Sequence, residues 1–249
     1  MIQYQRQDEI LSKLEQQQTM SVKKLARLLY TSEATIRRDL NTLEQMGLVY
    51  RIYGGVVLAK YANHDMPLFV RRQENAEEKD RIAAEAAAMV PDGATILLDA
   101  SSTVQHMVKY LFGRKGLTVI TNCLKVIEKL SESKVEVLCT GGRFLPDNAA
   151  FVGYQAEEML RGIQADYVFF SSQGITLEGD ICDNSEAETA VRRVMLDRAG
   201  QKIFLCDSSK IGRRGRYCVC RAEKLNRMIS EAALPEQLAE KVRGAGSGQ

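Results

Sequence analysis

Two short amphipathic helices separated by a polar turn are predicted between residues 21 and 46, and this pattern constrains the fold more than any other feature. A serine that can cap a helix N-terminus precedes each helix: Ser21 precedes the first and Ser32 the second. Apolar residues of the second helix repeat at helical spacing and fall on one face, namely Ile36, Leu40 and Leu43. The pattern predicts a helix-turn-helix, whose second helix enters the major groove of DNA.

A small β-hairpin is expected directly after this second helix, because Gly54 and Gly55 separate the runs 48–53 and 56–58. A hairpin in this place is the wing of a winged helix-turn-helix. The helix face opposite the apolar residues is polar, and it carries side chains that bind phosphates or base edges. A solvated face with incidental arginines is the competing interpretation, and the capping serines, the preceding helix and the hairpin argue against it. The candidate DNA-binding residues are Ser21, Ser32, Ala34, Thr35, Arg37, Arg38, Asn41, Arg51, Tyr53 and Gly54.

Length and charge agree with a small DNA-binding domain joined to a larger one. The chain has 249 residues, 45% of them hydrophobic, which is enough for two domains with real cores. Residues 1–60 hold nine basic against six acidic residues, so the positive charge is concentrated where DNA contact is expected. No apolar run is long enough for a membrane span, and the N-terminus is too polar for a signal peptide. We therefore expect a cytoplasmic protein.

Neither a metal site nor a cofactor is expected. The six cysteines form no C-x-x-C pair, and the two histidines, His64 and His106, neighbour no cysteine pair. Gly141 and Gly142 belong to neither a dinucleotide-binding motif nor a Walker loop. The pattern predicts reduced thiols that serve as small hydrophobic side chains.

From residue 77 onward the pattern changes to short apolar strands that alternate with helices. Strands rich in Val, Ile and Leu in this alternation predict a mostly parallel sheet covered on both faces. The strands are expected at 95–99, 117–121, 135–140, 166–171 and 202–207, with a long helix at 185–199. The predicted organisation is a winged helix-turn-helix at 1–58, a linker at 59–76, an α/β domain at 77–234 and a tail at 235–249.

Polar residues follow several of these strands at the point where each strand ends. The groups are 99–103, 121–122, 140–142 and 207–210. Ordinary helix capping explains any one of them. Because loops at the carboxyl ends of parallel strands meet at one edge of the sheet, their recurrence favours a pocket for an anionic small molecule.

These residues resemble the DeoR family of bacterial transcription regulators along nearly the whole chain. In the first domain the resemblance is carried by SVKKLA, TSEATIRRDL, LEQMG and RIYGG. In the second domain it is carried by EK (78–79), LDASST (98–103), TN (121–122), GG (141–142), FVG (151–153), SSQGI (171–175) and DSSKIG (207–212). Two residues depart from the family pattern: Ser101 replaces a glycine, and Tyr53 replaces a histidine before the wing glycines.

The resemblance implies a regulator, usually a repressor, of a carbohydrate-utilisation operon that responds to a phosphorylated sugar. The sensor domain is then similar to ribose-5-phosphate isomerase-like folds that no longer catalyse. The effector-binding residues that it implies are Asp99, Ser101, Ser102, Thr103, Thr121, Asn122, Gly141, Gly142 and Lys210. The expected partners are double-stranded operator DNA, the sugar phosphate and further copies of the chain in a dimer or tetramer, because paired DNA-binding domains increase affinity. A sugar-phosphate isomerase-like enzyme with a DNA-binding appendage and a transcriptional activator remain as alternatives.

Overall fold

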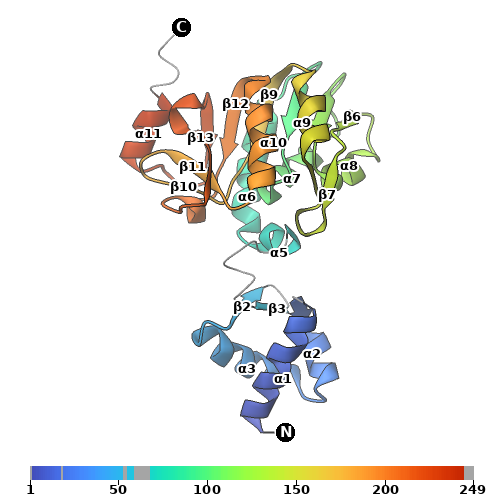
Figure 1. Cartoon of the computed structure of the whole chain (residues 1–249), viewed down its shortest axis with the longest axis vertical. Helices are drawn as coiled ribbons and strands as arrows, with labels where there is room; N and C mark the ends of the chain where they lie inside the picture. The colour runs from blue at the N-terminus through green and yellow to red at the C-terminus, as the bar shows by residue number, and fades with distance from the viewer. Residues whose placement is uncertain (1, 18, 53–54, 59–67, 244–249) are drawn as a thin grey trace. The chain divides into compact units, whose positions relative to one another are not determined.

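The computed structural model describes residues 2–17, 19–52, 55–58 and 68–243 of the chain. The chain divides into two compact units, Met1–Glu74 and Asn75–Gln249. Figure 1 shows the elements of both units.

The first unit is a winged helix-turn-helix, as the sequence predicts. Its helices are α1 (Gln3–Gln16), α2 (Val22–Leu28) and α3 (Glu33–Gln45), and its strands are β1 (Thr19–Ser21), β2 (Val49–Ile52) and β3 (Gly55–Leu58). The three strands form an antiparallel sheet in the order β1-β3-β2. The predicted hairpin thus gains a third strand, β1, which is too short to show periodicity in the sequence. Side chains from all three helices form the core with the hairpin, among them Leu14, Leu25 and Leu40.

Part of the predicted linker at 59–76 is helical. Residues 68–73 form α5 (Leu68–Gln73), and Leu68 is buried. Residues 59–67 lie outside the part of the chain that the structure describes.

The second unit is built on a six-stranded parallel sheet, which confirms the predicted mostly parallel α/β fold. Its strands are β4 (Thr95–Leu98), β5 (Thr118–Thr121), β6 (Glu136–Cys139), β9 (Ala165–Phe170), β12 (Ala199–Leu205) and β14 (Arg227–Ile229). They lie in the order β14-β12-β9-β4-β5-β6, and every neighbouring pair is parallel.

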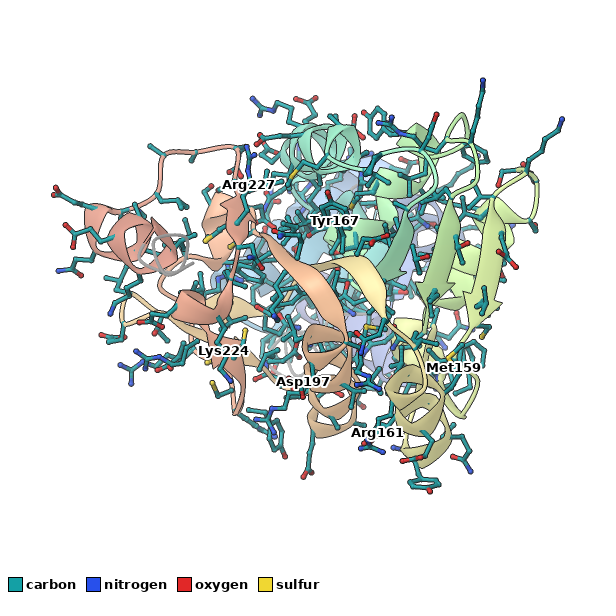
Figure 2. All side chains as sticks on the ribbon, turned by 90° about the horizontal axis from the view of Figure 1, so that it is seen from above. Met159, Arg161, Tyr167, Asp197, Lys224 and Arg227 are labelled. Atoms are coloured by element: carbon teal, nitrogen blue, oxygen red, sulfur yellow. The ribbon has the colours of Figure 1, made fainter. Side chains whose placement is uncertain are left out.

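Helices cover both faces of this sheet, and each face has its own core. Along β4, Ile96 and Leu98 point into one core while Leu97 points into the other, as the alternation of a strand requires. The first core receives α6 (Ala76–Ala88), α7 (Ser102–Gln105) and α8 (Leu124–Leu130). The second receives α9 (Tyr154–Arg161) and α10 (Glu186–Asp197). In Figure 2 the helices that carry Arg161 and Asp197 lie together on one side of the strand that carries Tyr167.

Short antiparallel strands, which the sequence pattern does not reveal, follow three of the parallel ones. The hairpin of β7 (Arg143–Leu145) and β8 (Ala150–Val152) comes after β6. A second antiparallel sheet contains β10 (Gly174–Ile175) and β11 (Asp180–Asp183), which follow β9, and β13 (Tyr217–Arg221), which follows β12. These strands therefore extend the loops at the carboxyl edge of the main sheet.

The first half of the predicted tail at 235–249 is helical. Residues 236–243 form α11 (Glu236–Arg243), in which Leu238 is fully buried and belongs to the second core. Burial of this leucine against the sheet and its helices explains why the segment is folded. Residues 244–249 lie outside the described part of the chain.

Candidate functional site

The start of α3 is fixed by side-chain hydrogen bonds. The Ser32 hydroxyl accepts a hydrogen bond from the backbone N–H of Thr35 at 3.1 Å and lies 2.9 Å from the Thr35 hydroxyl. The Ser21 hydroxyl caps α2 in the same way, accepting from the N–H of Lys24 at 3.1 Å. Both predicted capping serines therefore set the helix starts, which positions the exposed Ala34 and the partly exposed Thr35 on the first turn of α3.

The outer face of α3 presents its two arginines to solvent. Arg37 pairs with Glu33 one turn earlier at 3.4 Å, and both side chains are about half exposed. Arg38 is exposed as well. An exposed pair of this kind contributes little to stability, so the guanidinium of Arg37 can exchange Glu33 for a DNA phosphate at small cost.

The wing is fastened to α3 by two contacts of Arg51 on β2. Its guanidinium donates a hydrogen bond to the side-chain oxygen of Asn41, and its backbone N–H donates to Glu44 at 3.1 Å. The predicted residues Asn41 and Arg51 are thus brought together, and the wing has a defined attachment to the helix. Two predicted contacts in the hairpin, Tyr53 and Gly54, lie outside the described residues.

The first unit contains an ion pair, between Arg6 and Asp39, that the sequence does not predict. The carboxylate of Asp39 is almost fully buried and accepts two hydrogen bonds from Arg6, at 2.5 Å from Nε and 3.1 Å from Nη2. This bidentate pair links α1 to α3. Asp39 therefore holds α3 from its inner side, while Arg37 and Arg38 face outward.

The strand order of the second unit indicates where a ligand binds. Numbered along the chain, the six parallel strands lie in the order 3-2-1-4-5-6, so the order reverses between β4 and β9. Ligands of open α/β sheets bind outside the carboxyl ends of the strands at such a reversal. The residues that follow β4 and β9 are Asp99 and Ser171, each the first after its strand.

Asp99 is held by several groups at this position. One carboxylate oxygen accepts hydrogen bonds from the Ser101 N–H at 3.0 Å and the Ser101 hydroxyl at 2.5 Å, and the other accepts from the N–H of Ser171 at 3.3 Å. The Ser101 hydroxyl in turn caps α7, accepting from the N–H of Val104 at 3.4 Å. The serine that stands in place of the family's glycine thus has its own structural role in this loop.

A buried arginine completes the contacts of Asp99. Arg192 on α10 donates to Asp99 at 2.8 Å and to Asp183 at 2.9 Å, and all three side chains are nearly inaccessible to solvent. Asp183 is the last residue of β11, and it also accepts from the N–H groups of Asn184 and Ser185. The arginine therefore ties the loop after β4 to the antiparallel sheet and to the start of α10.

Lys210 connects three of the loops at the carboxyl edge. Its ammonium donates to the hydroxyl of Ser171 at 2.7 Å and to that of Thr103 at 3.2 Å, and it lies 3.5 Å from the carboxylate of Asp207. Burial opposes ionisation of Asp207, but Lys210 and the hydroxyl of Ser209 outweigh it, so the pKa of that carboxyl lies below its usual value. The site is thus a partly buried cation between two hydroxyl groups and a carboxylate.

The remaining predicted effector residues lie along the same edge. Ser102 is buried on the first turn of α7. The Thr121 hydroxyl donates to the carbonyl of Leu98 at 2.7 Å, and the Asn122 side chain donates to that of Phe151 at 3.0 Å. Gly141 and Gly142 follow β6 with positive φ angles of 63° and 107°. A side chain at Gly142 would lie 2.6 Å from the carbonyl oxygen of Val152, so only glycine fits there.

Two family models match the chain, and together they span both units. The model described as a DeoR-like helix-turn-helix domain matches residues 6–62, and the model described as a DeoR C terminal sensor domain matches residues 74–232. The chain belongs to the DeoR family. The predicted combination of a winged helix-turn-helix with an α/β sensor domain is confirmed, and so is the prediction of a DNA-binding transcriptional regulator.

Relatives of this DeoR-family regulator are similar over nearly their whole length. It is 34% identical to the HTH-type transcriptional regulator GolR of Listeria innocua, covering 99% of this chain and 97% of the relative. It is 30% identical to the transcriptional repressor AccR of Agrobacterium fabrum, covering 96% and 94%. It is 33% identical to the L-fucose operon activator of Haemophilus influenzae, covering 94% of each. All three are named as regulators, in agreement with the prediction of a regulator rather than an enzyme.

Among solved structures, the chain is similar to ribose 5-phosphate isomerase A from Methanocaldococcus jannaschii. The sequences are 17% identical, the TM-score is 0.42, and the match covers 55% of each chain. No helix within the described residues of this DeoR-family regulator is long and apolar enough to cross a membrane.

We call the carboxyl edge of the six-stranded sheet, with the loops that follow its strands, the sensor edge. Several residues there are absent from the site residues that the sequence of this DeoR-family protein predicts. These are Ser171, Asp183, Arg192, Asp207 and the buried pair of Asn148 with Glu188, whose side chains are 2.5 Å apart. Position after a strand is the signal for Ser171 and Asp207. Arg192 lies in the middle of a helix, where no local pattern distinguishes it from a surface arginine.

Proposed function

We propose that this DeoR-family regulator represses a carbohydrate-utilisation operon in the cytoplasm and leaves its operator when a phosphorylated sugar binds at Lys210. The observation that supports this is the ammonium of Lys210 between the hydroxyls of Thr103 and Ser171, at the reversal of the strand order. The named repressor AccR among its relatives supports the direction of regulation.

The chemistry of the loop suits a phosphate. A lysine ammonium binds phosphate as a point charge, and hydroxyl groups donate to its oxygens. Thr103 and Ser171 now use their oxygens to accept from Lys210, and a bound phosphate would let the ammonium and both hydroxyls donate to one anion instead. Asp99 takes part by fixing the loop, because its carboxylate is already paired with Arg192.

Control of DNA binding requires that the effector distinguish two arrangements of the protein. A ligand shifts such an equilibrium only through its differential affinity, typically ~1–3 kcal/mol of coupling free energy. We further propose that the regulator is a homo-oligomer, a dimer or a tetramer, because two linked DNA-binding domains on one operator bind far more tightly than one.

The test is a titration of the purified full-length protein bound to its own upstream DNA with a panel of sugar phosphates. We expect one compound to release the wild-type protein. Lys210→Met should bind the DNA with unchanged affinity and lose the response, whereas Lys134→Met, an exposed lysine before β6, should keep it. Specific DNA binding that no member of the panel changes would contradict the proposed effector class.

Activation is the second candidate, because one relative is named an operon activator. Transcription of the downstream operon in vitro, with and without the regulator, distinguishes the two directions. A rise in transcript on adding the protein would replace repression with activation and would leave the effector site unaffected.

A further inference from the structure

The first residue of the sensor unit, Asn75, is hydrogen-bonded to the loop that carries Lys210. Its side-chain N–H group donates to the carboxylate of Asp207 at 3.2 Å and to the hydroxyl of Ser209 at 3.1 Å. More than 130 residues separate Asn75 from these partners in the chain. We infer that Asn75 is a positioning residue that transmits occupancy of the effector loop to the segment joining the two units; this inference rests on the proposed function.

The backbone of Asn75 is shaped for this position. Its φ and ψ angles of 50° and 41° are left-handed, a conformation that asparagine tolerates better than other residues with a side chain except glycine. Its carbonyl accepts from the N–H of Lys79 at 2.9 Å, which begins α6. Since α6 buries Ile82 and Ala86 in the core, Asn75 marks the point where the chain becomes fixed to the sensor.

Asp207 is shared between Lys210 and Asn75. Its carboxylate is 1% exposed, and its charge is compensated mainly by the Lys210 ammonium 3.5 Å away and further by the buried Lys79. An anion that draws the Lys210 ammonium toward itself removes part of that compensation. A carboxylate with less cationic compensation is a stronger acceptor, so its hydrogen bond from Asn75 tightens.

A stronger hydrogen bond to Asn75 would constrain the backbone at the point where the chain leaves the sensor unit. Asn75 directly follows Glu74, the last residue of the DNA-binding unit. Effector binding therefore restricts the conformations open to the connecting segment, which gives the two units fewer relative placements on DNA.

The role of Asn75 can be tested by hydrogen exchange of the full-length protein, measured by mass spectrometry. Inorganic phosphate is the probe, and chloride at equal ionic strength is the reference. In the wild type we expect phosphate to slow exchange at 208–212 and also at 75–80. The expected slowing at 75–80 is about two- to tenfold, as one strengthened hydrogen bond gives. In Asn75→Gly, which keeps the left-handed backbone and lacks the amide, we expect slowing at 208–212 alone.

Two further variants isolate the hydrogen bond. Asn75→Asp keeps the shape of the side chain but places a carboxylate beside Asp207, so it should behave as Asn75→Gly does. Gln73→Ala, an exposed position on α5, should respond as the wild type does. Thermal unfolding of each variant verifies that the sensor is folded.

The outcomes separate this inference from the proposed function. Slowing at 208–212 in the wild type without slowing at 75–80, or slowing at both places in Asn75→Gly, overturns the role of Asn75 and leaves the effector site standing. No slowing at 208–212 in the wild type contradicts the anion site at Lys210 and the inference with it.

Discussion

Arg192 and Asp99, which lie 93 positions apart in the chain, form a 2.8 Å ion pair that is almost completely buried. The same guanidinium reaches Asp183 at 2.9 Å, so one cation neutralises the carboxylate that follows β4 and the carboxylate that ends β11. The loop that carries Ser101 and Thr103 therefore depends on a residue of α10 for its position.

Replacing Arg192 by Gln should destabilise the sensor strongly, because two carboxylates lose their buried cation. Breaking a buried pair of this kind costs about 3–5 kcal/mol. Urea unfolding of the full-length protein measures the loss. The control is Arg81→Gln, whose side chain is 66% exposed and pairs with Glu78 at 3.6 Å, and which should change stability by less than about 0.5 kcal/mol. An equally small effect for Arg192→Gln would show that the carboxylates find other partners.

In the DNA-binding unit, Arg6→Ala should be more damaging than Asp39→Ala. Loss of Arg6 leaves a carboxylate that is 1% exposed without its cation, whereas loss of Asp39 leaves a guanidinium that is 14% exposed and can be hydrated. We expect a cost of about 3 kcal/mol for Arg6→Ala. Chemical unfolding of both variants compares them, with Glu33→Ala, which removes the half-exposed partner of Arg37, as the control. The reverse ranking would mean that Asp39 finds a second donor when Arg6 is gone.

Arg38→Ala should weaken binding to the specific operator by about 1–3 kcal/mol if its guanidinium contacts a base edge. Arg37→Ala should instead weaken binding to specific and random DNA alike and lower the salt dependence by roughly one counterion, as expected for a phosphate contact. Fluorescence anisotropy at several salt concentrations separates the two effects. Unchanged operator affinity for Arg38→Ala would remove this residue from the interface.

Thiol reactivity should follow burial. Burial raises the pKa of Cys123 to about 11 and those of Cys206 and Cys220 to about 12, so the fraction of reactive thiolate at pH 8 is very small. Cys139 is exposed and should react first with iodoacetamide, while exposed Cys218 should follow more slowly because partial burial raises its pKa. Mass spectrometry of timed samples gives the order, and urea should make all six cysteines reactive. Labelling of Cys206 in the folded protein as fast as that of Cys139 would contradict the burial of Cys206.

The sequence clearly predicts those helices and strands whose residue pattern repeats over a short stretch of the chain. The capping serines and the spacing of Ile36, Leu40 and Leu43 predict α3 within one residue of its ends. Apolar runs likewise predict five of the parallel strands. Central strands such as β4 and β5 are buried on both faces and therefore mostly hydrophobic. The short strands β10 and β13 lie outside the long apolar runs and carry too few residues to show alternation. Helix α11 is short and follows a proline.

Some residues of the candidate site can be placed from a local sequence pattern, and others cannot. Thr103 and Lys210 are predictable because each follows a strand whose end is predictable. Arg192, Asp183 and Asn75 take their roles from partners far away in the chain, and only the folded structure brings those partners together. The structure also explains the serine at position 101, where the family has a glycine. Its hydroxyl donates to Asp99 and accepts from the N–H of Val104 on the first turn of α7.

Each carboxylate named at the sensor edge is paired with another side chain of the protein. Asp99 and Asp183 share Arg192, Glu188 is bonded to Asn148, and Asp207 is bonded to Asn75 and Ser209. Each of these carboxylates is therefore already engaged in holding the fold. We expect the phosphorylated sugar of the proposed function to leave this edge chemically unchanged, so that binding reports its concentration without consuming it.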